Sequence, residues 1–329
     1  MRPLDSARGR PFDTAQGNPF DSAQGRPALV LTAGLGTRLR PLTLVRAKGA
    51  VPVNGEPLAR RVAGWLASNG YRDLVFNLHH HPASIAACLG DGADLDVRVR
   101  YSWEQPVLGS AGGPRHALPL LTDGGNQTFL IVNGDTLTDV DLAALERTHI
   151  STGALVTMAV IPNPAPQKYG GVLVTGGWVR GFTRAGSEQE SYHFVGVQLA
   201  NAAAFSSLDD NVASESVNWL YPRMLAENPH SIAAFISGAT FRDIGTPADC
   251  LRTSHELAAI EGERSMGRGT TVDATAVIKG SSLWDDVTVG ARARLLDCIV
   301  ADGVHVPAGS HYERSAIVQT DGHLLVQPL

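Results

Sequence analysis

The sequence has few charged residues, few aromatic residues and almost no cysteine. Charged side chains make up 18% of the 329 residues, aromatic side chains make up 6%, and the three cysteines are Cys88, Cys250 and Cys298. The cysteines lie far apart and form no C-x-x-C pair, so the sequence predicts neither a disulfide framework nor a zinc site. A chain without disulfides suits a reducing compartment, and the cytoplasm is the expected location.

Long apolar runs and an excess of basic residues are also missing. No run of about 18 apolar residues occurs, so we expect no transmembrane helix and no membrane partner. The 27 Lys and Arg are outnumbered by 32 Asp and Glu. Non-specific binding to nucleic acid needs a basic face, so we expect no nucleic-acid partner. The hydrophobic fraction is nevertheless 43%, which excludes a wholly disordered chain.

The segment before Pro27 is a short repeat. The sequences RPLDSARG, RPFDTAQG and NPFDSAQG follow one another from Arg2 to Gly25. They are rich in Pro, Gly, Asp and Gln and contain few large apolar residues, so burial cannot offset the entropy lost on ordering. We expect residues 1–26 to be a low-complexity, disordered tail. The alternative is that the start site is over-extended and that the real protein begins near Pro27.

Residues 27–265 alternate between apolar strands and amphipathic helices. The runs 28–32 and 128–132 are continuously apolar, as is typical of buried parallel strands. Other strands are expected at 73–78, 95–101, 153–160, 171–175 and 192–198, and helices at 57–69, 82–89, 139–148, 216–227 and 246–262. This alternation predicts a Rossmann-like, doubly wound α/β fold with right-handed crossovers.

Residues 266–329 follow a six-residue apolar period. Val272, Ile278 and Trp284 are spaced by six, as are Val287, Ala293 and Ile299, with small and turn residues between them. This pattern predicts a hexapeptide-repeat β-helix of two or three coils, with the spaced residues pointing inward and Cys298 as a small core residue. A stack this short must cover its ends with the first domain or another chain, so homo-oligomerisation through the β-helix is one expectation. An ordinary small β-domain is the alternative.

A glycine-rich turn directly after the first predicted strand is the strongest candidate site. The turn contains Gly34 and Gly36, and glycines there allow the backbone to approach a phosphate closely and to direct N–H groups at it. Arg38 adds a guanidinium group that can bind phosphate oxygens bidentately, and Lys48 adds a second cation. The turn matches neither G-x-G-x-x-G nor a P-loop, because no Gly-Lys-Ser/Thr follows.

Two acidic residues are candidates for metal binding. Asp135 follows the apolar strand 128–132, at the edge where open α/β sheets bind ligands. Asp243 precedes Thr246 and Pro247, which together predict a helix start. Each aspartate alone is also explained as a cap or turn residue. Together they offer two hard oxygen ligands, which suit Mg²⁺ in the presence of substrate phosphates.

These motifs, taken in order, resemble a known family. Residues 34–43 with Lys48, then 109–113, 133–135, 169–170 and 243–247, are similar to motifs of the sugar-1-phosphate nucleotidylyltransferases. The resemblance runs from about Pro27 to the C-terminus, and the last segment is similar to the left-handed β-helix that many members carry. It implies that a nucleoside triphosphate and a sugar 1-phosphate react to give a nucleotide sugar and pyrophosphate.

The resemblance also implies roles for individual residues. The triphosphate and base would be bound by Ala33, Gly34, Gly36, Thr37, Gln105 and Gly109. Catalysis would depend on Arg38, Lys48 and Asp135, and Mg²⁺ would be bound by Asp135 and Asp243. The sugar phosphate would be bound by Tyr169, Gly170 and Arg184. Arg184 is included because the Glu-Lys-Pro segment that many members use for this purpose is missing between residues 171 and 194.

The sequence leaves the substrates open. The stretch 77–80 and residues 109–113 are most similar to members that make GDP-mannose, or to a uridylyltransferase acting on N-acetylmuramate 1-phosphate. The β-helix favours a mannose-1-phosphate guanylyltransferase-like enzyme that uses GTP, with UTP as the alternative. A non-catalytic regulatory or scaffold homologue is a third hypothesis, because Gly49 replaces the proline that usually follows this lysine and loosens the backbone there.

Two other enzyme classes are less favoured. A GT-A-like glycosyltransferase normally has a D-x-D pair, and residues 135–139 do not give that spacing. An acyltransferase site in the β-helix is disfavoured by the small number of coils. The run His79-His80-His81 is expected to be a loop near the base or the sugar, because adjacent loop residues cannot all face one metal ion.

Overall fold

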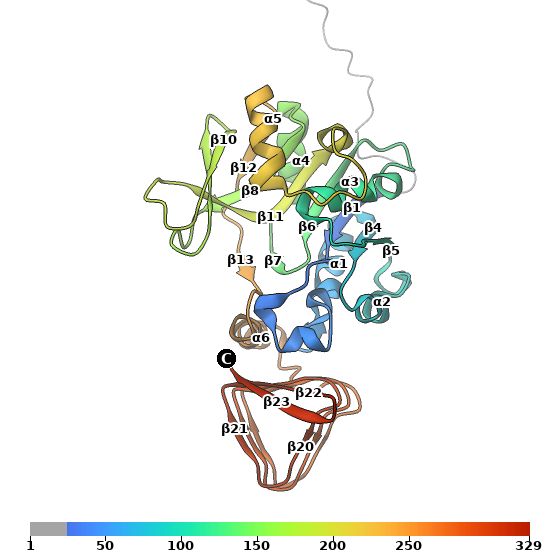
Figure 1. Cartoon of the computed structure of the whole chain (residues 1–329), viewed down its shortest axis with the longest axis vertical. Coiled ribbons are helices and arrows are strands. Elements are labelled where there is room, and N and C mark those ends of the chain that lie inside the picture. Colours follow the sequence, from blue (N-terminus) through green and yellow to red (C-terminus); the bar gives the residue numbers. More distant parts are fainter. Residues whose placement is uncertain (1–24) are drawn as a thin grey trace, which may run out of the picture.

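The computed structural model describes residues 25–329 (Figure 1). The predicted low-complexity tail therefore lies outside the described residues, apart from its last two positions. Arg26 already belongs to the first strand, β1 (Arg26–Leu31), and its guanidinium group forms a 2.9 Å ion pair with Glu146. Strand β1 thus starts one residue before the predicted boundary at Pro27.

A nine-stranded mixed sheet forms the centre of the α/β region. In spatial order its strands are β5 (Arg98–Trp103), β4 (Tyr71–Leu78), β1, β6 (Thr128–Asn133), β11 (Tyr192–Asn201), β8 (Val156–Pro162), β12 (Ile232–Ile236), β10 (Trp178–Thr183) and β9 (Gly171–Thr175). Strands β5, β4, β1 and β6 are mutually parallel, whereas β11 is antiparallel to both β6 and β8. Strands β1 and β6 end next to each other, where Leu31 pairs with Asn133. The glycine-rich turn that follows β1 and Asp135, which follows β6, therefore lie at the same edge of the sheet.

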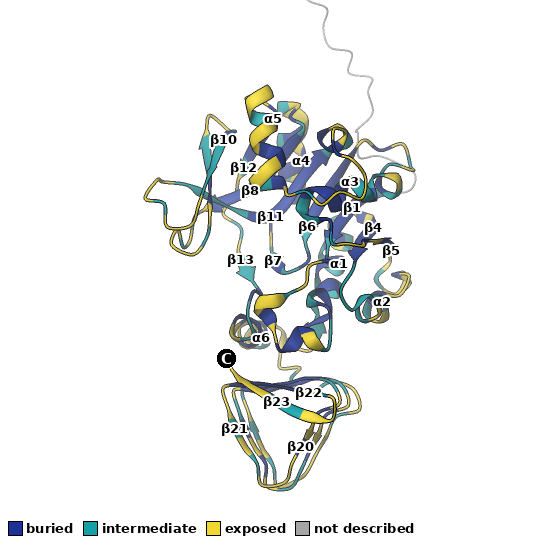
Figure 2. Cartoon of the chain, viewed as in Figure 1, coloured by how far each residue is buried: buried dark blue, intermediate teal, exposed yellow. Residues whose placement is uncertain are grey.

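Helices cover both faces of this sheet. Buried apolar side chains form two clusters, one on each face of the sheet. Strand β1 contributes to both clusters, because alternate side chains of a strand point to opposite faces. Ala28 and Val30 pack with α1 (Leu58–Ser68), α2 (Pro82–Leu89) and α4 (Leu142–Thr152). Leu29 packs with α3 (Gly109–Leu121) and α5 (Tyr221–Glu227). The predicted three-layer α/β fold is confirmed, and Figure 2 shows the buried central strands between exposed helix surfaces.

No helix within residues 25–329 is both long enough and apolar enough to span a membrane.

Helix α3 is not among the helices that the sequence predicts. The helix starts at Gly109 and also contains two prolines. Its first turn is held by tertiary contacts: the carbonyl oxygen of Ser214 accepts hydrogen bonds from the backbone N–H groups of Ala111 (2.8 Å) and Gly112 (3.1 Å). A Cβ on Gly112 would lie 2.6 Å from the Val212 carbonyl oxygen. Close packing therefore overrides the low helix propensity of glycine.

The C-terminal region forms three coils of a β-helix. Each of its three flat sheets takes one strand from each coil: β14 (Thr271–Val272), β17 (Thr288–Val289) and β20 (His305–Val306); β15 (Val277–Lys279), β18 (Arg294–Leu296) and β21 (His311–Glu313); β16 (Ser282–Leu283), β19 (Ile299–Val300) and β22 (Ser315–Thr320). Figure 1 shows the resulting triangular stack below the α/β region. Strand β23 (His323–Pro328) then pairs antiparallel with β22, and α6 (Pro247–Glu261) precedes the coils.

The face formed by β16, β19 and β22 packs against the α/β region. Trp284 and Ile299 belong to an apolar cluster with Leu39 and Leu42 from the α/β region. The prediction that Trp284 and Ile299 point into the coil is therefore wrong. Their strand neighbours Leu283 and Val300 fill the coil interior instead, because side chains alternate along a strand.

Two other predictions about the coil have different outcomes. Val272 is 36% exposed, although the six-residue pattern predicted it inside, because it belongs to the first coil and has a further coil on one side only. Cys298 is fully buried with the interior cluster, as predicted.

Candidate active site

The glycine-rich turn after β1 needs glycine at one position and is open at the other. Gly36 has a φ of 60°, and a Cβ there would lie 2.7 Å from Cγ2 of Thr43. The Thr43 hydroxyl also donates a 2.9 Å hydrogen bond to the Gly36 carbonyl oxygen. A Cβ on Gly34, in contrast, would meet no atom within 4 Å, so the backbone at Gly34 borders open space.

A cavity of about 310 Å³ lies beside this turn, at the carboxyl ends of the central strands. Its walls come from the ends of β1, β4 and β6, from the start of α3, and from the segment before α5. The lining residues include Ala33, Gly34, Lys48, Asn77, Glu104, Gly109, Ser110, Asp135 and Glu215. The cavity therefore brings together residues from six separate stretches of the sequence, 31–34, 48–49, 77, 104–110, 133–135 and 215.

Asp135 and Lys48 form a direct ion pair at this cavity. The Lys48 ammonium group lies 2.5 Å from Oδ2 of Asp135. The neighbouring Gly49 is closely packed. A Cβ on Gly49 would lie 3.0 Å from side-chain atoms of both Ile85 and Thr32, so close packing accounts for glycine there.

A small two-stranded sheet brings Asp243 to Asp135. Strand β13 (Phe241–Asp243) pairs antiparallel with β7 (Thr136–Thr138), which places Asp243 opposite Thr136. The N–H of Ile244 also donates to the Asp135 carbonyl oxygen at 3.1 Å. Burial, followed by the nearby negative charge of Asp135, raises the pKa of Asp243 against the opposing effects of Lys48 and Arg38.

Arg38 completes this group of charged residues. The Cβ position of Gly245 is 3.0 Å from Nη1 of Arg38 and 3.1 Å from Oδ2 of Asp243. Gly245 therefore leaves room for the guanidinium and the carboxylate at the same point. The structure thus gathers Arg38, Lys48, Asp135 and Asp243, which are widely separated in the sequence, at one edge of the sheet.

Tyr169 and Lys168 lie on the far side of Asp243, where a cavity of about 510 Å³ opens. The Tyr169 hydroxyl is 3.5 Å from Oδ2 of Asp243, and its ring contacts His193, with ring centroids 4.5 Å apart. The Lys168 ammonium group is 4.9 Å from the centre of the Tyr169 ring. Interaction with Tyr169 is the largest cause of a raised Lys168 pKa, to which Asp243 also contributes.

The remaining predicted site residues differ in their packing and in their distance from the two cavities. Gly170 packs so closely that a Cβ would be 2.8 Å from the Thr183 carbonyl oxygen. Thr37 starts the short 3-10 turn that carries Arg38. Gln105 is exposed and is not among the lining residues of the first cavity. Arg184 is exposed on the loop after β10 and lines neither cavity.

Sequence analysis missed Asn77 and Glu104, which form a buried polar column under the glycine-rich turn. Glu104 is fully buried; its Oε1 accepts from Nδ2 of Asn77 (2.7 Å) and its Oε2 from the N–H of Leu108 (2.8 Å). Oδ1 of Asn77 in turn accepts from the N–H of Thr32 at 2.6 Å. The rule that singled out Asp135, a polar residue where a strand ends at this edge, applies equally to Asn77 and Glu104.

Lys168 and Glu215 were also missed. Lys168 stands directly before the Tyr169-Gly170 motif, outside the stretch 171–194 in which the resemblance places the sugar-phosphate lysine. Glu215 comes from an irregular segment far along the chain. Its Oε2 accepts from the Ser110 hydroxyl at 2.7 Å, and its Oε1 is 2.6 Å from the Cβ position of Gly109. No sequence signal marks Glu215.

The three consecutive histidines have structural contacts. His79 Nδ1 is 2.9 Å from the Glu104 carbonyl oxygen, and His80 Nε2 is 2.8 Å from that of Thr43. His81 has a φ of 46° and precedes α2. Within residues 25–329, no group of three or more His, Cys, Asp or Glu side chains is arranged to hold a metal ion.

Comparison with known proteins identifies the family. A family model described as nucleotidyl transferase matches residues 27–259. A mannose-1-phosphate guanylyltransferase from Mycobacterium tuberculosis is 30% identical over 302 residues, which cover 87% of this chain and 83% of that protein. An N-acetylmuramate alpha-1-phosphate uridylyltransferase from Neisseria meningitidis is 42% identical over 129 residues, or 38% of this chain and 53% of that protein.

A solved structure supports the same assignment at the level of the fold. The crystal structure of HddC from Yersinia pseudotuberculosis matches with a TM-score of 0.61 and 19% identity, over 70% of this chain and 99% of that chain. The resemblance predicted from the sequence motifs is confirmed, and the chain belongs to the nucleotidyl transferase family.

Proposed function

We propose that this protein makes a nucleotide sugar and pyrophosphate from GTP and mannose 1-phosphate. The observation that carries the proposal is the meeting of Arg38 and Lys48 with Asp135 and Asp243 beside a glycine-rich turn. The similarity over most of the chain to a mannose-1-phosphate guanylyltransferase supports this substrate pair. The uridylyltransferase relative, which matches over 129 residues, supports the alternative substrates, UTP and N-acetylmuramate 1-phosphate.

In the proposed reaction, the residues mainly position two polyanions and offset their repulsion. An oxygen of the sugar phosphate attacks the α-phosphorus, a new P–O bond forms, and the bond to the leaving pyrophosphate breaks. The backbone beside Gly34 binds the triphosphate, while Arg38 and Lys48 stabilise the negative charge that shifts toward pyrophosphate. No protein nucleophile is needed, because alignment of the reactants supplies much of the rate enhancement.

We propose Asp135 and Asp243 as the residues that hold Mg²⁺. They fit this role because two carboxylates are held close enough for one to raise the pKa of the other, and a divalent cation relieves such repulsion. Mg²⁺ is commonly held by one or two carboxylates together with substrate phosphates and water. When bound, the ion would neutralise phosphate charge, while the ion pair with Lys48 orients the Asp135 carboxylate.

Glu215 supports guanine as the base. Its carboxylate lines the cavity beside Gly109, and Oε1 has no hydrogen bond to any residue that the structure describes. Guanine presents two adjacent donors, N1–H and the N2 amino group, and a carboxylate can accept from both. Uracil presents one N–H between two carbonyl oxygens, which a carboxylate repels. The charge at Glu215 therefore favours guanine over uracil.

We propose Lys168, rather than the sequence candidate Arg184, as the cation for the sugar phosphate. Lys168 lines the same cavity as Tyr169 and Asp243, and these two residues both raise its pKa. Arg184 remains exposed outside that cavity. A lysine in this place supplies the positive charge that the missing Glu-Lys-Pro segment provides in other members.

An assay of pyrophosphate release tests the proposed reaction. The purified protein is incubated with Mg²⁺, each of the four nucleoside triphosphates and a panel of sugar 1-phosphates. We expect release that requires both substrates and is fastest with GTP and mannose 1-phosphate. A preference for UTP and N-acetylmuramate 1-phosphate would support the alternative. No release with any pair would instead support the regulatory or scaffold hypothesis.

The substitution Glu215→Gln tests base selection. It replaces one acceptor with a donor, so we expect kcat/KM for GTP to fall about 10–100-fold, the usual value of a bidentate contact to a base, while kcat/KM for UTP changes less than threefold. Steady-state kinetics with both nucleotides measures this ratio. Glu227→Gln, at the exposed end of α5, is the matched control. Equal losses with both nucleotides would contradict a role in base selection.

The substitution Lys168→Ala tests sugar-phosphate binding. We expect KM for the sugar 1-phosphate to rise about tenfold, with KM for the nucleotide changed less than twofold, because an exposed charge-assisted contact contributes about 1–2 kcal/mol. Arg184→Ala is the comparison and should leave both KM values within twofold. If Arg184→Ala has the larger effect, the assignment of Lys168 is wrong.

A further inference from the structure

The segment between Arg38 and Lys48 is covered by the β-helix. Leu39 and Leu42 from this segment pack in one apolar cluster with Trp284 and Ile299 from the first two coils. The catalytic residues of the proposed function are thus at the two ends of a segment whose middle rests on another region of the chain. The β-helix lies close enough to influence where those ends are held.

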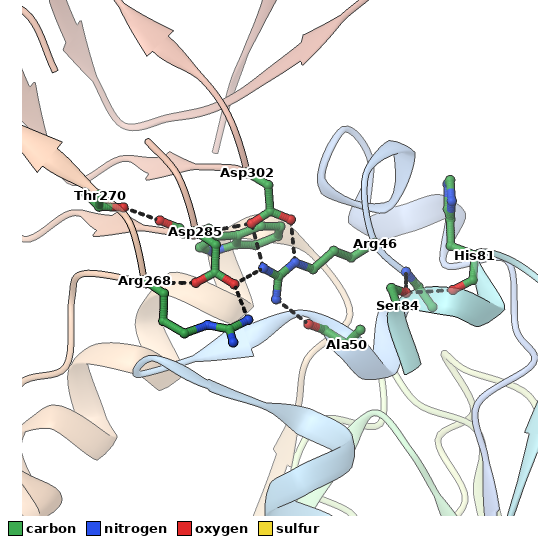
Figure 3. A network of polar contacts seen from close by, with 10 residues as sticks. Arg46, Ala50, His81, Ser84, Arg268, Thr270, Asp285 and Asp302 are labelled. Atoms are coloured by element: carbon green, nitrogen blue, oxygen red, sulfur yellow. Dashed lines mark hydrogen bonds and ion pairs between the residues drawn. The ribbon is translucent and has the colours of Figure 1, made fainter. Parts of the chain in front are cut away.

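Arg46 makes the main polar contact between this segment and the coils (Figure 3). Its Nε lies 2.5 Å from Oδ2 of Asp302, and its Nη2 lies 2.6 Å from Oδ1 of the same carboxylate. Nη2 is also 2.9 Å from Oδ2 of Asp285. The guanidinium carbon is 5.4 Å from the centre of the Trp284 ring. The bidentate contact fixes both the position and the plane of the guanidinium, and the indole adds a cation–π contact.

The two carboxylates that hold Arg46 are themselves fixed. Asp285 and Asp302 occupy equivalent turns of successive coils, and the N–H of Asp285 donates to Oδ1 of Asp302 at 3.1 Å. Asp285 also accepts a 2.8 Å hydrogen bond from the N–H of Arg268. The Arg46 side chain is only 15% exposed, so water competes little for these contacts.

The opposite side of the segment is held by the start of α2. The N–H of Ala47 donates to the Ser84 hydroxyl at 2.9 Å, and that hydroxyl donates to the His81 carbonyl oxygen at 2.7 Å. His80 Nε2 contacts the Thr43 carbonyl oxygen at 2.8 Å. The backbone directly before Lys48 is therefore fixed from two sides, by the β-helix and by the α/β region.

We propose that Arg46 is a positioning residue, through which the β-helix holds Lys48 against Asp135 and keeps Arg38 directed toward Asp243. Arg46 itself does not line the cavity beside the glycine-rich turn. The inference rests on the proposed function, because it assigns to Arg46 the placement of two residues that the reaction requires. It gives the three coils a part in catalysis that the family assignment does not include.

The experiment compares Arg46→Met with Arg61→Met in the full chain. Arg61 is the matched control, because it makes a similar bidentate pair with Glu261 (2.8 and 2.9 Å) and is 10% exposed, yet it contacts none of Arg38, Lys48, Asp135 or Asp243. We expect both variants to lower Tm, but only Arg46→Met to lower kcat, by about 10–100-fold. Asp302→Asn removes the same contact more conservatively and should lower kcat in the same direction.

A second background separates positioning from stabilisation. Because part of the proposed effect passes through Lys48, Arg46→Met should lower kcat less in a Lys48→Met protein than in the unaltered protein. Arg46→Lys should recover only part of the activity, because an ammonium group cannot make the bidentate contact. Calorimetric binding of pyrophosphate provides a readout that does not need turnover, and Arg46→Met should weaken it about tenfold.

The outcomes distinguish this inference from the proposed function. If Arg46→Met and Asp302→Asn lower Tm as Arg61→Met does, yet leave kcat and pyrophosphate binding within twofold, Arg46 only joins two regions of the chain and the inference is wrong. An equal loss of kcat in the Lys48→Met background would also overturn it. If the unaltered protein releases no pyrophosphate with any substrate pair, the proposed function fails, while the binding measurement still tests Arg46.

Discussion

Asp135→Asn and Asp243→Asn should each lower turnover by about 100–1,000-fold, since each removes a carboxylate that would hold the Mg²⁺ needed to offset the phosphate charge. Both variants should bind Mg²⁺ more weakly, which a titration of activity against metal concentration would reveal as a shift to higher concentrations. We expect the loss in kcat to exceed that of any other substitution in the chain, because the two carboxylates lie close together, Asp135 in the turn before β7 and Asp243 at the end of β13.

We expect Asp243→Asn to lower activity without lowering folding stability. The pKa of Asp243 is raised by burial and by Asp135, so its ionised form is less favourable in the folded chain than in the unfolded chain. An acid of this kind lowers stability at pH values above its unfolded pKa. The neutral Asn removes that cost, and Tm at pH 7 should stay the same or rise.

The control for both variants is Asp321→Asn, in the exposed turn between β22 and β23. It should leave kcat and Tm unchanged. Full activity of Asp135→Asn and Asp243→Asn would exclude these aspartates from the active site. A fall in Tm of about 10 °C in either variant would mean that the loss of activity reflects damage to the fold.

The central part of the fold could be predicted because its signals are local. The apolar runs at β1 and β6 and the glycines that follow them lie within short stretches of sequence. The six-residue period of the coils is equally local. It does not state which neighbour in each strand points inward, so Trp284 and Ile299 were placed on the wrong side.

Other features depend on contacts between distant residues and left no readable pattern. Strands β7 and β13 have three residues each, too few to show a period, yet they bring Asp135 and Asp243 together. Helix α3 contains glycine and proline at positions that favour a loop, and contacts from residues 212–214 hold it in place. Glu215 directly follows residues 212–214 in the sequence. Its place at the cavity depends on the same long-range contacts and could not be predicted from the sequence.

Glu104→Leu should cause the largest loss of stability among the residues of the first cavity. Glu104 is fully buried, and its carboxylate accepts from Asn77 and from the N–H of Leu108. Leucine would leave both buried donors without a partner, at about 1–3 kcal/mol each. For a region of this size the expected fall in Tm is about 5–10 °C, with Glu104→Gln intermediate because it keeps one acceptor. Glu188→Leu, on an exposed loop, is the matched control and should change Tm by less than about 1 °C.

The same substitution should also impair binding of the triphosphate, although Glu104 need not touch it. Asn77 holds the N–H groups of Thr32 and Ala33 through Oδ1, and Glu104 fixes the Asn77 amide in the orientation that permits this. Without Glu104 the amide can rotate, and the turn after β1 loses its fixed conformation. KM for the nucleotide should therefore rise about tenfold in Glu104→Leu, measured below its lowered Tm, while KM for the sugar 1-phosphate stays within twofold. If Tm falls clearly but KM for the nucleotide is unchanged, Glu104 supports only the fold. The conformation of the turn would then depend on Gly34 and Gly36 and not on Glu104.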